Sequence, residues 1–328
     1  MANAVMEQGP ASDMGEPRRH EKYERLIATA RAQPPLKVAV AHPCDEAALG
    51  AVMEAAALGL VEPLLVGPRD KIAASAAALQ VDIAGVRVID ALHSHAAAEQ
   101  AVAQVHTGAA EGLMKGSLHT DELIAAVVRR EGGLRTARRL SHCFVMDVPD
   151  HATPLIITDA AINIAPTLEE KRDIVQNAID LARVFGLDPV RVAIVSAMET
   201  VNPKVPSTLD AAALCKMADR GQITGALVDG PLALDNAIDL GAARIKKIAS
   251  PVAGRADVLV VPDLEAGNVL AKSLTFLAGA DAAGIVLGAR VPIILTSRAD
   301  SRLTRLASCA VASLFASAQR RIRALPEI

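Results

Sequence analysis

The sequence predicts an α/β protein in which mostly parallel sheets carry helices on both faces. Short apolar strands and helical segments alternate along most of the chain, which is the pattern of parallel βαβ units. The run Val291–Leu295 is apolar throughout, as expected of a strand buried on both faces. Leu303–Leu314 then repeats apolar residues at helical spacing, which indicates a helix with one buried face.

Length and composition narrow the class further. The 328 residues are enough for two domains, each with its own core. With no Trp, one Tyr and a net charge of -3, the chain lacks the aromatic and basic surface that nucleic acids require. No apolar run approaches the ~18 residues of a membrane span. Four cysteines without CxxC spacing are typical of a reducing compartment. We therefore expect a cytoplasmic protein with neither nucleic-acid nor membrane partners.

The first half of the chain shows the alternation most clearly. Residues 1–20, rich in Gly, Pro and polar groups, predict a flexible tail. The strands expected after it cover 37–41, 63–67 and 86–90, with a short one ending at 114. The helices expected cover 21–32, 69–78, a segment from the 42–45 turn to 59, and one that Thr120 caps.

Lys115, Gly116, Ser117, His119 and Thr120 surround the start of that last helix. A helix N-terminus with nearby hydroxyl and cationic groups is a place where an anion can bind. The GxxxxGK[ST] pattern of a Walker loop is absent, so these residues alone are a weak phosphate signal. His119 by itself is more often a structural hydrogen-bonding residue than a catalytic one.

Arginines concentrate in two places. Five lie between residues 129 and 139, and a second group consists of Arg290, Arg298, Arg302 and Arg305. A solvated face explains such a run in most proteins. In a chain that is acidic overall, two arginine-rich segments favour a small polyanionic ligand.

From about residue 144 the pattern restarts. We expect strands at 155–159, 192–196, 225–229 and 257–262, and helices that begin after Thr167, near Ser207 and after residue 268. Thr167 and Glu170 form a capping-box pattern. Carboxylates stand at or beside three of the strand ends, at Asp159, Asp229 and Asp263. Such groups can hold Mg²⁺ or cap helices, and we favour capping.

A strand-to-helix junction near the end of the chain is the strongest candidate site. Ser297, Arg298 and Asp300 place a hydroxyl, a guanidinium and a carboxylate within four residues. In open α/β sheets, ligands bind outside the carboxyl ends of strands. The alternative is that Asp300 or Ser301 only caps the helix and Arg298 lies on the surface.

The chain resembles the phosphate acetyltransferase and phosphate butyryltransferase family from about residue 37 to 315. Six blocks in the same order carry the resemblance, at residues 114–121, 157–163, 202–208, 229–232, 265–268 and 295–300. It implies reversible transfer of a short acyl group between coenzyme A and orthophosphate. It also implies a homodimer and a two-domain fold of the isocitrate/isopropylmalate dehydrogenase type with the active site in the interdomain cleft. The expected first domain is 21–143 plus 287–328, and the expected inserted second domain is 144–286.

The resemblance also suggests roles for residues. Ser297 would hydrogen-bond the coenzyme A sulfur, Arg298 would neutralise phosphate, and Asp300 would take the thiol proton. Phosphate would lie on the loop made by Lys115, Gly116, Ser117, His119 and Thr120. We assign coenzyme A binding to Arg290, Arg302 and Arg305. We expect no metal and no cofactor, since coenzyme A is a substrate.

The sequence departs from the acetyltransferase pattern at two positions. Thr304 stands where those members carry the expected base, and Ala125 where they carry an arginine. Acetyl and butyryl therefore both remain open as the acyl group, and Asp300 as base competes with Asp300 as helix cap. Two other functions remain as alternatives: a metal- and NAD-dependent dehydrogenase of the same fold, and a non-catalytic protein that binds acyl phosphate or coenzyme A.

Overall fold

The computed structural model describes residues 20–149, 151–296 and 300–323. Its strands are β1 Leu36–Ala41, β2 Val61–Gly67, β3 Arg87–Asp90, β4 Gly112–Lys115, β5 Ser141–Asp147, β6 Leu155–Thr158, β7 Val190–Val195, β8 Ala226–Leu232, β9 Val258–Val260, β10 Asp281–Leu287 and β11 Ile293–Ile294. Its helices are α1 Glu21–Arg31, α2 Glu46–Ala57, α3 Arg69–Leu79, α4 Ser94–His106, α5 Thr120–Val128, α6 Leu168–Val184, α7 Pro206–Asp219, α8 Leu234–Ile238, α9 Leu240–Ile245, α10 Leu264–Leu277 and α11 Arg302–Arg323.

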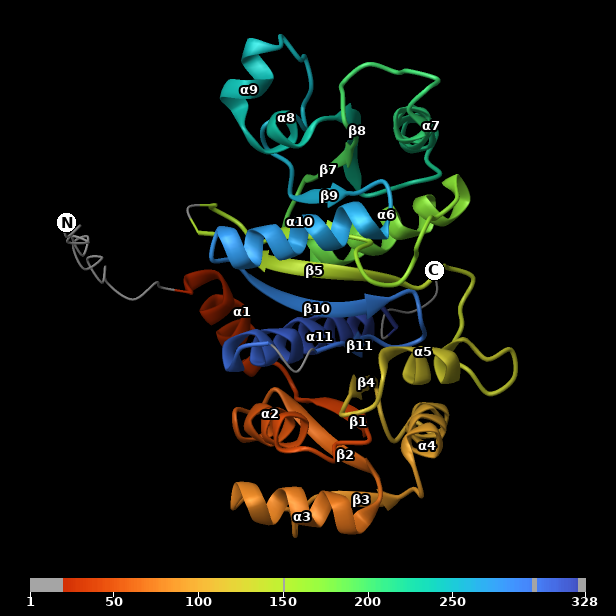
Figure 1. Cartoon of the computed structure of the whole chain (residues 1–328), viewed down its shortest axis with the longest axis vertical. Helices are drawn as coiled ribbons and strands as arrows, with labels where there is room; N and C mark the ends of the chain where they lie inside the picture. The colour runs from red at the N-terminus through yellow and green to blue at the C-terminus, as the bar shows by residue number, and fades with distance from the viewer. Residues whose placement is uncertain (1–19, 150, 297–299, 324–328) are drawn as a thin grey trace, which may run out of the picture.

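One sheet runs through the whole molecule, with strand order β3-β2-β1-β4-β11-β10-β5-β6-β9-β7-β8. Two groups of neighbouring strands are parallel within themselves. The first group is β3, β2, β1, β4 and β11, and the second is β6, β9, β7 and β8. Between these groups, the β11–β10, β10–β5 and β5–β6 pairings are antiparallel. In Figure 1 the first group lies below, the second above, and β10 and β5 cross the middle. The predicted α/β class with a mostly parallel sheet is confirmed.

Helices cover both faces of the sheet. One core cluster joins buried residues of α1, α2, α6, α7 and α11 to one face. On the other face, α4 and α5 pack over the first group of strands. Helices α8 to α10 pack over the second group on that same side. The two halves are therefore joined through the continuous sheet and the helices of the first face.

The strands expected from the sequence are present with ends shifted by a few residues, whereas β5 and β10 were missed. Their composition explains this. β5 contains polar residues at three of its seven positions, and β10 reads Asp-Ala-Ala-Gly before its apolar end. Ala, Gly and Asp are depleted in strands, so neither segment has a strong strand signal. Both strands form because each is paired on two sides.

The predicted domain boundaries fall inside these two strands. Residues 143 and 144 belong to β5, and residues 286 and 287 belong to β10. The chain leaves the first half through β5 and returns through β10, and β11 then pairs with β4. This path is compatible with an inserted second domain, and the division into two domains remains a prediction.

The last helix, α11, is more deeply buried than its amphipathic pattern indicated. The predicted apolar positions Leu306, Ala307, Ala310, Val311 and Leu314 are all buried. Its small polar residues are buried too: Ser308 donates to the carbonyl of Thr304 at 2.9 Å and accepts from the Gly284 N–H at 3.1 Å. A serine hydroxyl bonded inside the helix and to the sheet, as in Ser308, allows close packing, whereas the buried Ser313 hydroxyl has no hydrogen-bond partner among the described residues.

Within the described residues, no helix is both long enough and apolar enough to cross a membrane. Cys44, Cys143, Cys215 and Cys309 are all free thiols.

Candidate active site

The loop after β4 is built around a glycine that no other residue can replace without movement. The Gly116 N–H donates to the Ala41 carbonyl at 2.9 Å, which continues the parallel pairing of β4 with β1. A Cβ atom at Gly116 would lie 2.4 Å from the Ala41 oxygen and 2.5 Å from the His42 oxygen. Because both contacts are with backbone, the neighbouring chain cannot easily move away. The loop is thus fixed directly against the end of β1.

Ser117 is held by His42, which follows β1. The Ser117 hydroxyl donates to the His42 carbonyl at 2.8 Å, and its oxygen lies 2.9 Å from the His42 Nδ1. The Cys44 N–H also donates to this hydroxyl, at 3.3 Å. A hydroxyl has one proton, so when that proton goes to the carbonyl, the ring must donate from Nδ1. Burial, and then the charge of Lys71, lower the pKa of His42 and so favour the neutral ring, which donates to Ser117 in the tautomer with its proton on Nδ1.

Helix α5 starts one residue earlier than the sequence indicated. Its N-cap residue is His119, whose extended backbone fits that position, and Thr120 is the first helical residue. The prediction that Thr120 caps the helix is therefore wrong. The His119 ring is exposed and makes no capping hydrogen bond, while Asp121 and Glu122 lie in the first turn as expected. The first N–H groups of α5 have no partner within the helix, which is the condition for binding an anion.

β11 brings the end of the chain beside this loop. Ile293 and Ile294 pair in parallel with Leu113 and Met114, so Leu295 lies next to Lys115. Ser297 and Arg298 lie outside the described residues. Asp300 is partly buried, and the cap of α11 is Ser301, whose hydroxyl accepts from the Thr304 N–H at 3.1 Å.

The three arginines assigned to coenzyme A separate into two places. Arg302 forms an ion pair with Glu54, and the Arg305 guanidinium donates to the Ala47 carbonyl at 3.3 Å. Both partners are on α2, the helix that follows the His42 turn. Arg290 precedes β11, and its N–H donates to the Leu134 carbonyl at 2.9 Å. It therefore lies at the end of β11 away from Lys115.

The loop after β6 contains a buried carboxylate that binds its own backbone. Asp159 accepts hydrogen bonds from the N–H groups of Ala161, Ile162 and Asn163 at 2.9, 3.0 and 3.2 Å. The Asn163 amide donates to the same carboxylate at 2.5 Å and to the Leu140 carbonyl at 2.8 Å. This loop is thus fastened to the segment that leads into β5.

Asn163 also orients Arg139, which lies at a pocket between the two halves. The Arg139 Nε donates to the Asn163 Oδ1 at 2.7 Å, and its guanidinium lies 3.1 Å from Glu170. The pocket has a volume of about 760 Å³ and lies between α5 and the start of α6. Its lining includes Arg135 and Arg138, so part of the arginine run from 129 to 139 does face a hollow. None of the predicted phosphate-loop residues lines it.

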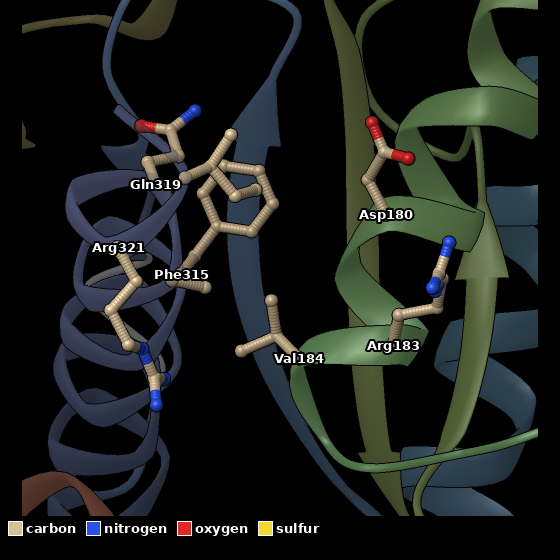
Figure 2. Close-up of a pocket in the computed structure, with 8 residues that line it drawn as sticks. Asp180, Arg183, Val184, Phe315, Gln319 and Arg321 are labelled. Atoms are coloured by element: carbon tan, nitrogen blue, oxygen red, sulfur yellow. The ribbon is translucent and has the colours of Figure 1, made fainter. Parts of the chain in front are cut away.

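A second hollow, of about 650 Å³, lies between α6 and α11 on the other face of the sheet (Figure 2). Phe315 and Val184 form its apolar floor, with Asp180, Arg183 and Arg321 around it. It contains no residue that the sequence indicated as a site residue.

Of the three carboxylates expected at strand ends, Asp263 caps a helix, whereas Asp229 lies inside β8 and Asp159 binds the N–H groups of its own loop. Asp263 accepts from the Ala266 N–H at 2.8 Å as the N-cap of α10, and Thr167 with Glu170 forms the predicted capping box of α6. Asp229 accepts from the Gly230 N–H at 2.9 Å. Across the described parts of the chain, no three His, Cys, Asp or Glu side chains are grouped to hold a metal ion.

Sequence reasoning missed His42 and Asn163 as site residues. Each acts through a contact with a residue far along the chain: His42 with Ser117, and Asn163 with Arg139 and Leu140. His42 has one local signal, because it precedes a proline at the end of a strand. That signal indicates a turn and says nothing about its partner.

Similar solved structures define the class to which this fold belongs. A branched-chain phosphotransacylase from Enterococcus faecalis V583 is 30% identical, with a TM-score of 0.73 over 86% of this chain and 99% of that one. A 4-hydroxythreonine-4-phosphate dehydrogenase from Klebsiella pneumoniae, at 14% identity and a TM-score of 0.53 over 86% of this chain and 99% of that one, shares the fold alone. The fold is that of the phosphotransacylases and of a dehydrogenase group related to them in architecture.

Residues 94–313 match the family described as phosphate acetyl/butaryl transferase, and the chain belongs to this family. The phosphate acetyltransferase of Rhizobium meliloti is 64% identical over 93% of this chain and 96% of its own length. The phosphate butyryltransferase of Clostridium acetobutylicum is 41% identical over 90% of this chain and 98% of its own. The dehydrogenase alternative is therefore supported by similarity of fold alone, whereas the acyltransferase function is supported by membership of the family.

Proposed function

We propose that this protein is a phosphate acyltransferase, which transfers a short acyl group reversibly between acyl-coenzyme A and orthophosphate. The observation that carries the proposal is the parallel pairing of β11 with β4, which puts Leu295 beside Lys115. Two segments that are far apart in sequence, one with hydroxyl and cationic groups at a helix start and one leading to Ser297 and Arg298, thus end at the same edge of the sheet. Family membership supports the same reaction.

The reaction needs an anion site and a thiolate, and no covalent enzyme intermediate. Orthophosphate or the acyl phosphate would bind at the start of α5, with Lys115 and Thr120 beside it. The coenzyme A thiol would pass its proton to a carboxylate, for which Asp300 is the candidate, while Ser297 hydrogen-bonds the sulfur. The thiolate would attack the acyl carbon, the C–S bond forming as the C–O bond to phosphate breaks. Arg298 would neutralise the phosphate and the charge on the acyl oxygen.

Arg302 and Arg305 are the cations we propose for coenzyme A, since both are on the first turn of α11 and contact α2. Coenzyme A would be a substrate, and we propose no bound cofactor. We also propose a homodimer, the assembly that the resemblance implies. Helix α10 exposes Val269 and Phe276, seven residues apart on one face, to 65% and 79%. Light scattering should then give the mass of two chains.

A thiol-release assay tests the function. Acetyl-coenzyme A and butyryl-coenzyme A are each supplied with and without orthophosphate, and the released coenzyme A is measured. We expect release that depends on phosphate, and the ratio of kcat/KM for the two thioesters gives the acyl preference. Arg298→Ala should lower turnover on the order of 10²-fold or more, as loss of one oxyanion donor does. The exposed Arg220, the C-cap residue of α7, provides the matched control, and Arg220→Ala should leave turnover unchanged.

Thioester cleavage that is indifferent to orthophosphate would contradict the proposal. Binding of acyl phosphate or coenzyme A without turnover would favour the non-catalytic alternative.

A further inference from the structure

Asp281, the first residue of β10, lies at the same edge of the sheet as the candidate site. β10 is antiparallel to β11, with Ile285 opposite Ile294. Asp281 is four residues before Ile285, so it projects about 13 Å beyond that pair, toward the end at which β11 and β4 finish.

The carboxylate of Asp281 bonds to the first turn of α11. Its Oδ1 accepts from the Thr304 hydroxyl at 3.2 Å and from the Ser301 hydroxyl at 3.4 Å. Ser301 itself caps the helix through the Thr304 N–H, and the two hydroxyls are 3.0 Å apart. One acid therefore holds both side chains that start the helix. Thr304 is 4% exposed whereas Ser301 is exposed, so the bond from Thr304 is the more buried of the two.

A second acid lies directly opposite Asp281 on β5. Asp147 and Asp281 are cross-strand partners, an arrangement that normally destabilises a sheet. Lys22 of helix α1 supplies a cation that offsets it, and His20, the N-cap residue of that helix, approaches both acids. Lys22 Nζ lies 3.0 Å from Asp147 Oδ1, and His20 Nδ1 lies 3.0 Å from Asp281 Oδ2 and 3.8 Å from Asp147 Oδ2. Neither His20 contact has the geometry of a hydrogen bond.

The two acids differ in what else they touch. Asp147 is almost fully buried and contacts α1. Asp281 contacts α1 as well, and in addition holds α11 through Ser301 and Thr304. If the acid pair only fastened α1 to the sheet, α11 would not need to take part in it.

We propose that Asp281 is a positioning residue for the acyl-transfer site, acting through Ser301 and Thr304. Its carboxylate fixes the start of α11 relative to β4 and β5, and thereby the place of Asp300 directly before that turn. The inference rests on the proposed function. No sequence pattern singles out Asp281, which lies twenty-three positions before Thr304 in a weakly patterned strand.

The test compares truncation of the two acids. Asp281→Ala should lower kcat roughly 10-fold or more, because a displacement of ~1 Å at a reacting group can cost on the order of 10²-fold. Asp147→Ala removes the acid that lies opposite Asp281 and pairs with Lys22, and should change kcat by less than about twofold while lowering stability. Asp281→Asn keeps an acceptor oxygen at the same reach and should restore most of the lost turnover.

A double-mutant cycle separates this role from a general loss of stability. Thr304→Val keeps the shape and removes the hydroxyl that Asp281 binds. If Asp281 acts through Thr304, the Asp281→Ala, Thr304→Val double variant should lose no more turnover than Asp281→Ala alone, within about twofold. Additive losses, or equal losses of kcat in Asp281→Ala and Asp147→Ala, would overturn the proposal.

Hydrogen exchange provides a measurement that does not depend on activity. Asp281→Ala should speed amide exchange over residues 301–308, whereas Asp147→Ala should speed it mainly in α1. If the wild-type protein shows no phosphate-dependent thiol release, the proposed function fails, and this comparison still decides whether Asp281 holds α11. Unchanged exchange over 301–308 in Asp281→Ala would refute the positioning role.

Discussion

The loops after β4 and after β6 differ in whether a carboxylate of the protein occupies their backbone N–H groups. Each loop follows a buried strand, and each has backbone N–H groups that can donate to an anion at the turn. After β6, the protein supplies its own anion: Asp159 accepts from three consecutive N–H groups and from the Asn163 amide. After β4, no side chain of the described residues caps α5, and the hydroxyl of Ser117 is bonded back to His42.

This difference separates a structural loop from a loop that can bind substrate. A turn already filled by a buried carboxylate has no room and no free donors for another anion. A helix start without a side-chain cap keeps its N–H donors for a ligand. The first loop can therefore be rigid in itself and still leave the anion to the substrate, which is what a reaction with orthophosphate requires.

The largest expected effect is on the loop after β6. Asp159→Ala leaves buried N–H groups without an acceptor, each worth about 1–3 kcal/mol, so the free energy of unfolding should fall by about 3 kcal/mol or more. Urea unfolding measures it. Asp229→Ala is the control: its carboxylate is bonded to the Gly230 N–H, and the loss should be below about 1 kcal/mol. Equal losses would mean that the Asp159 loop is not held by its internal anion.

Gly116→Ala tests the loop after β4. The added Cβ would meet two backbone oxygens, so the loop must shift, and turnover should fall on the order of 10²-fold. Gly85 provides the matched control, since a Cβ there meets nothing within 4 Å. Gly85→Ala should leave both turnover and melting temperature near their wild-type values. Normal turnover in Gly116→Ala would show that this loop need not be rigid.

His142, near Asp159 of the loop after β6, should make the stability of the protein depend on pH. Burial lowers the pKa of His142 to about 4, and the nearby Asp159 raises it by a smaller amount. The folded protein then binds fewer protons than the unfolded chain, so stability should fall as pH decreases from about 6.5 to 4, by roughly 2–3 kcal/mol. In His142→Gln this part of the slope should vanish, measured by urea unfolding at several pH values. The exposed His95 provides the control, and His95→Gln should keep the slope.

Ser117→Ala should have the smallest effect on stability. It tests whether the Ser117 hydroxyl only fixes the loop after β4 or also contacts the substrate. Loss of its bonds to His42 should lower the free energy of unfolding by about 1 kcal/mol. If the hydroxyl also contacts phosphate, KM for orthophosphate should rise as well. A rise in KM with unchanged stability would mean that Ser117 faces the substrate and that its bond to His42 is dispensable.

Much of the fold could be predicted because its signals are local. Apolar runs and helical spacing identified most of the parallel strands and the last helix, and Thr167 with Glu170 marked the start of α6 correctly. The same local patterns failed where pairing partners decide the structure. β10 begins with Asp-Ala-Ala-Gly, which is a poor strand sequence, and it becomes a strand because β5 and β11 pair with it on both sides.

For the candidate site, too, the residues could be predicted from local signals but their contacts could not. The residues of the loop after β4 could be chosen from their types and from a helix start. Their bonding could not, because Ser117 and His42 are seventy-five residues apart. Arg290 and Arg302 looked alike in sequence, yet they lie at opposite ends of β11, since a strand separates the residues before it from those after it by its full length.

The sequence by itself determined the kinds of elements, the glycine turn after β4 and the family to which the chain is similar. These follow from side-chain periodicity, turn chemistry and residue order, all of which act over a few residues. Tertiary structure alone decided that β11 lies between β4 and β10, that Asp159 serves its own loop, and that Asp281 reaches the start of α11. Such contacts form only when distant segments are brought together in one sheet, and no local pattern in a single chain specifies which partner each segment will meet.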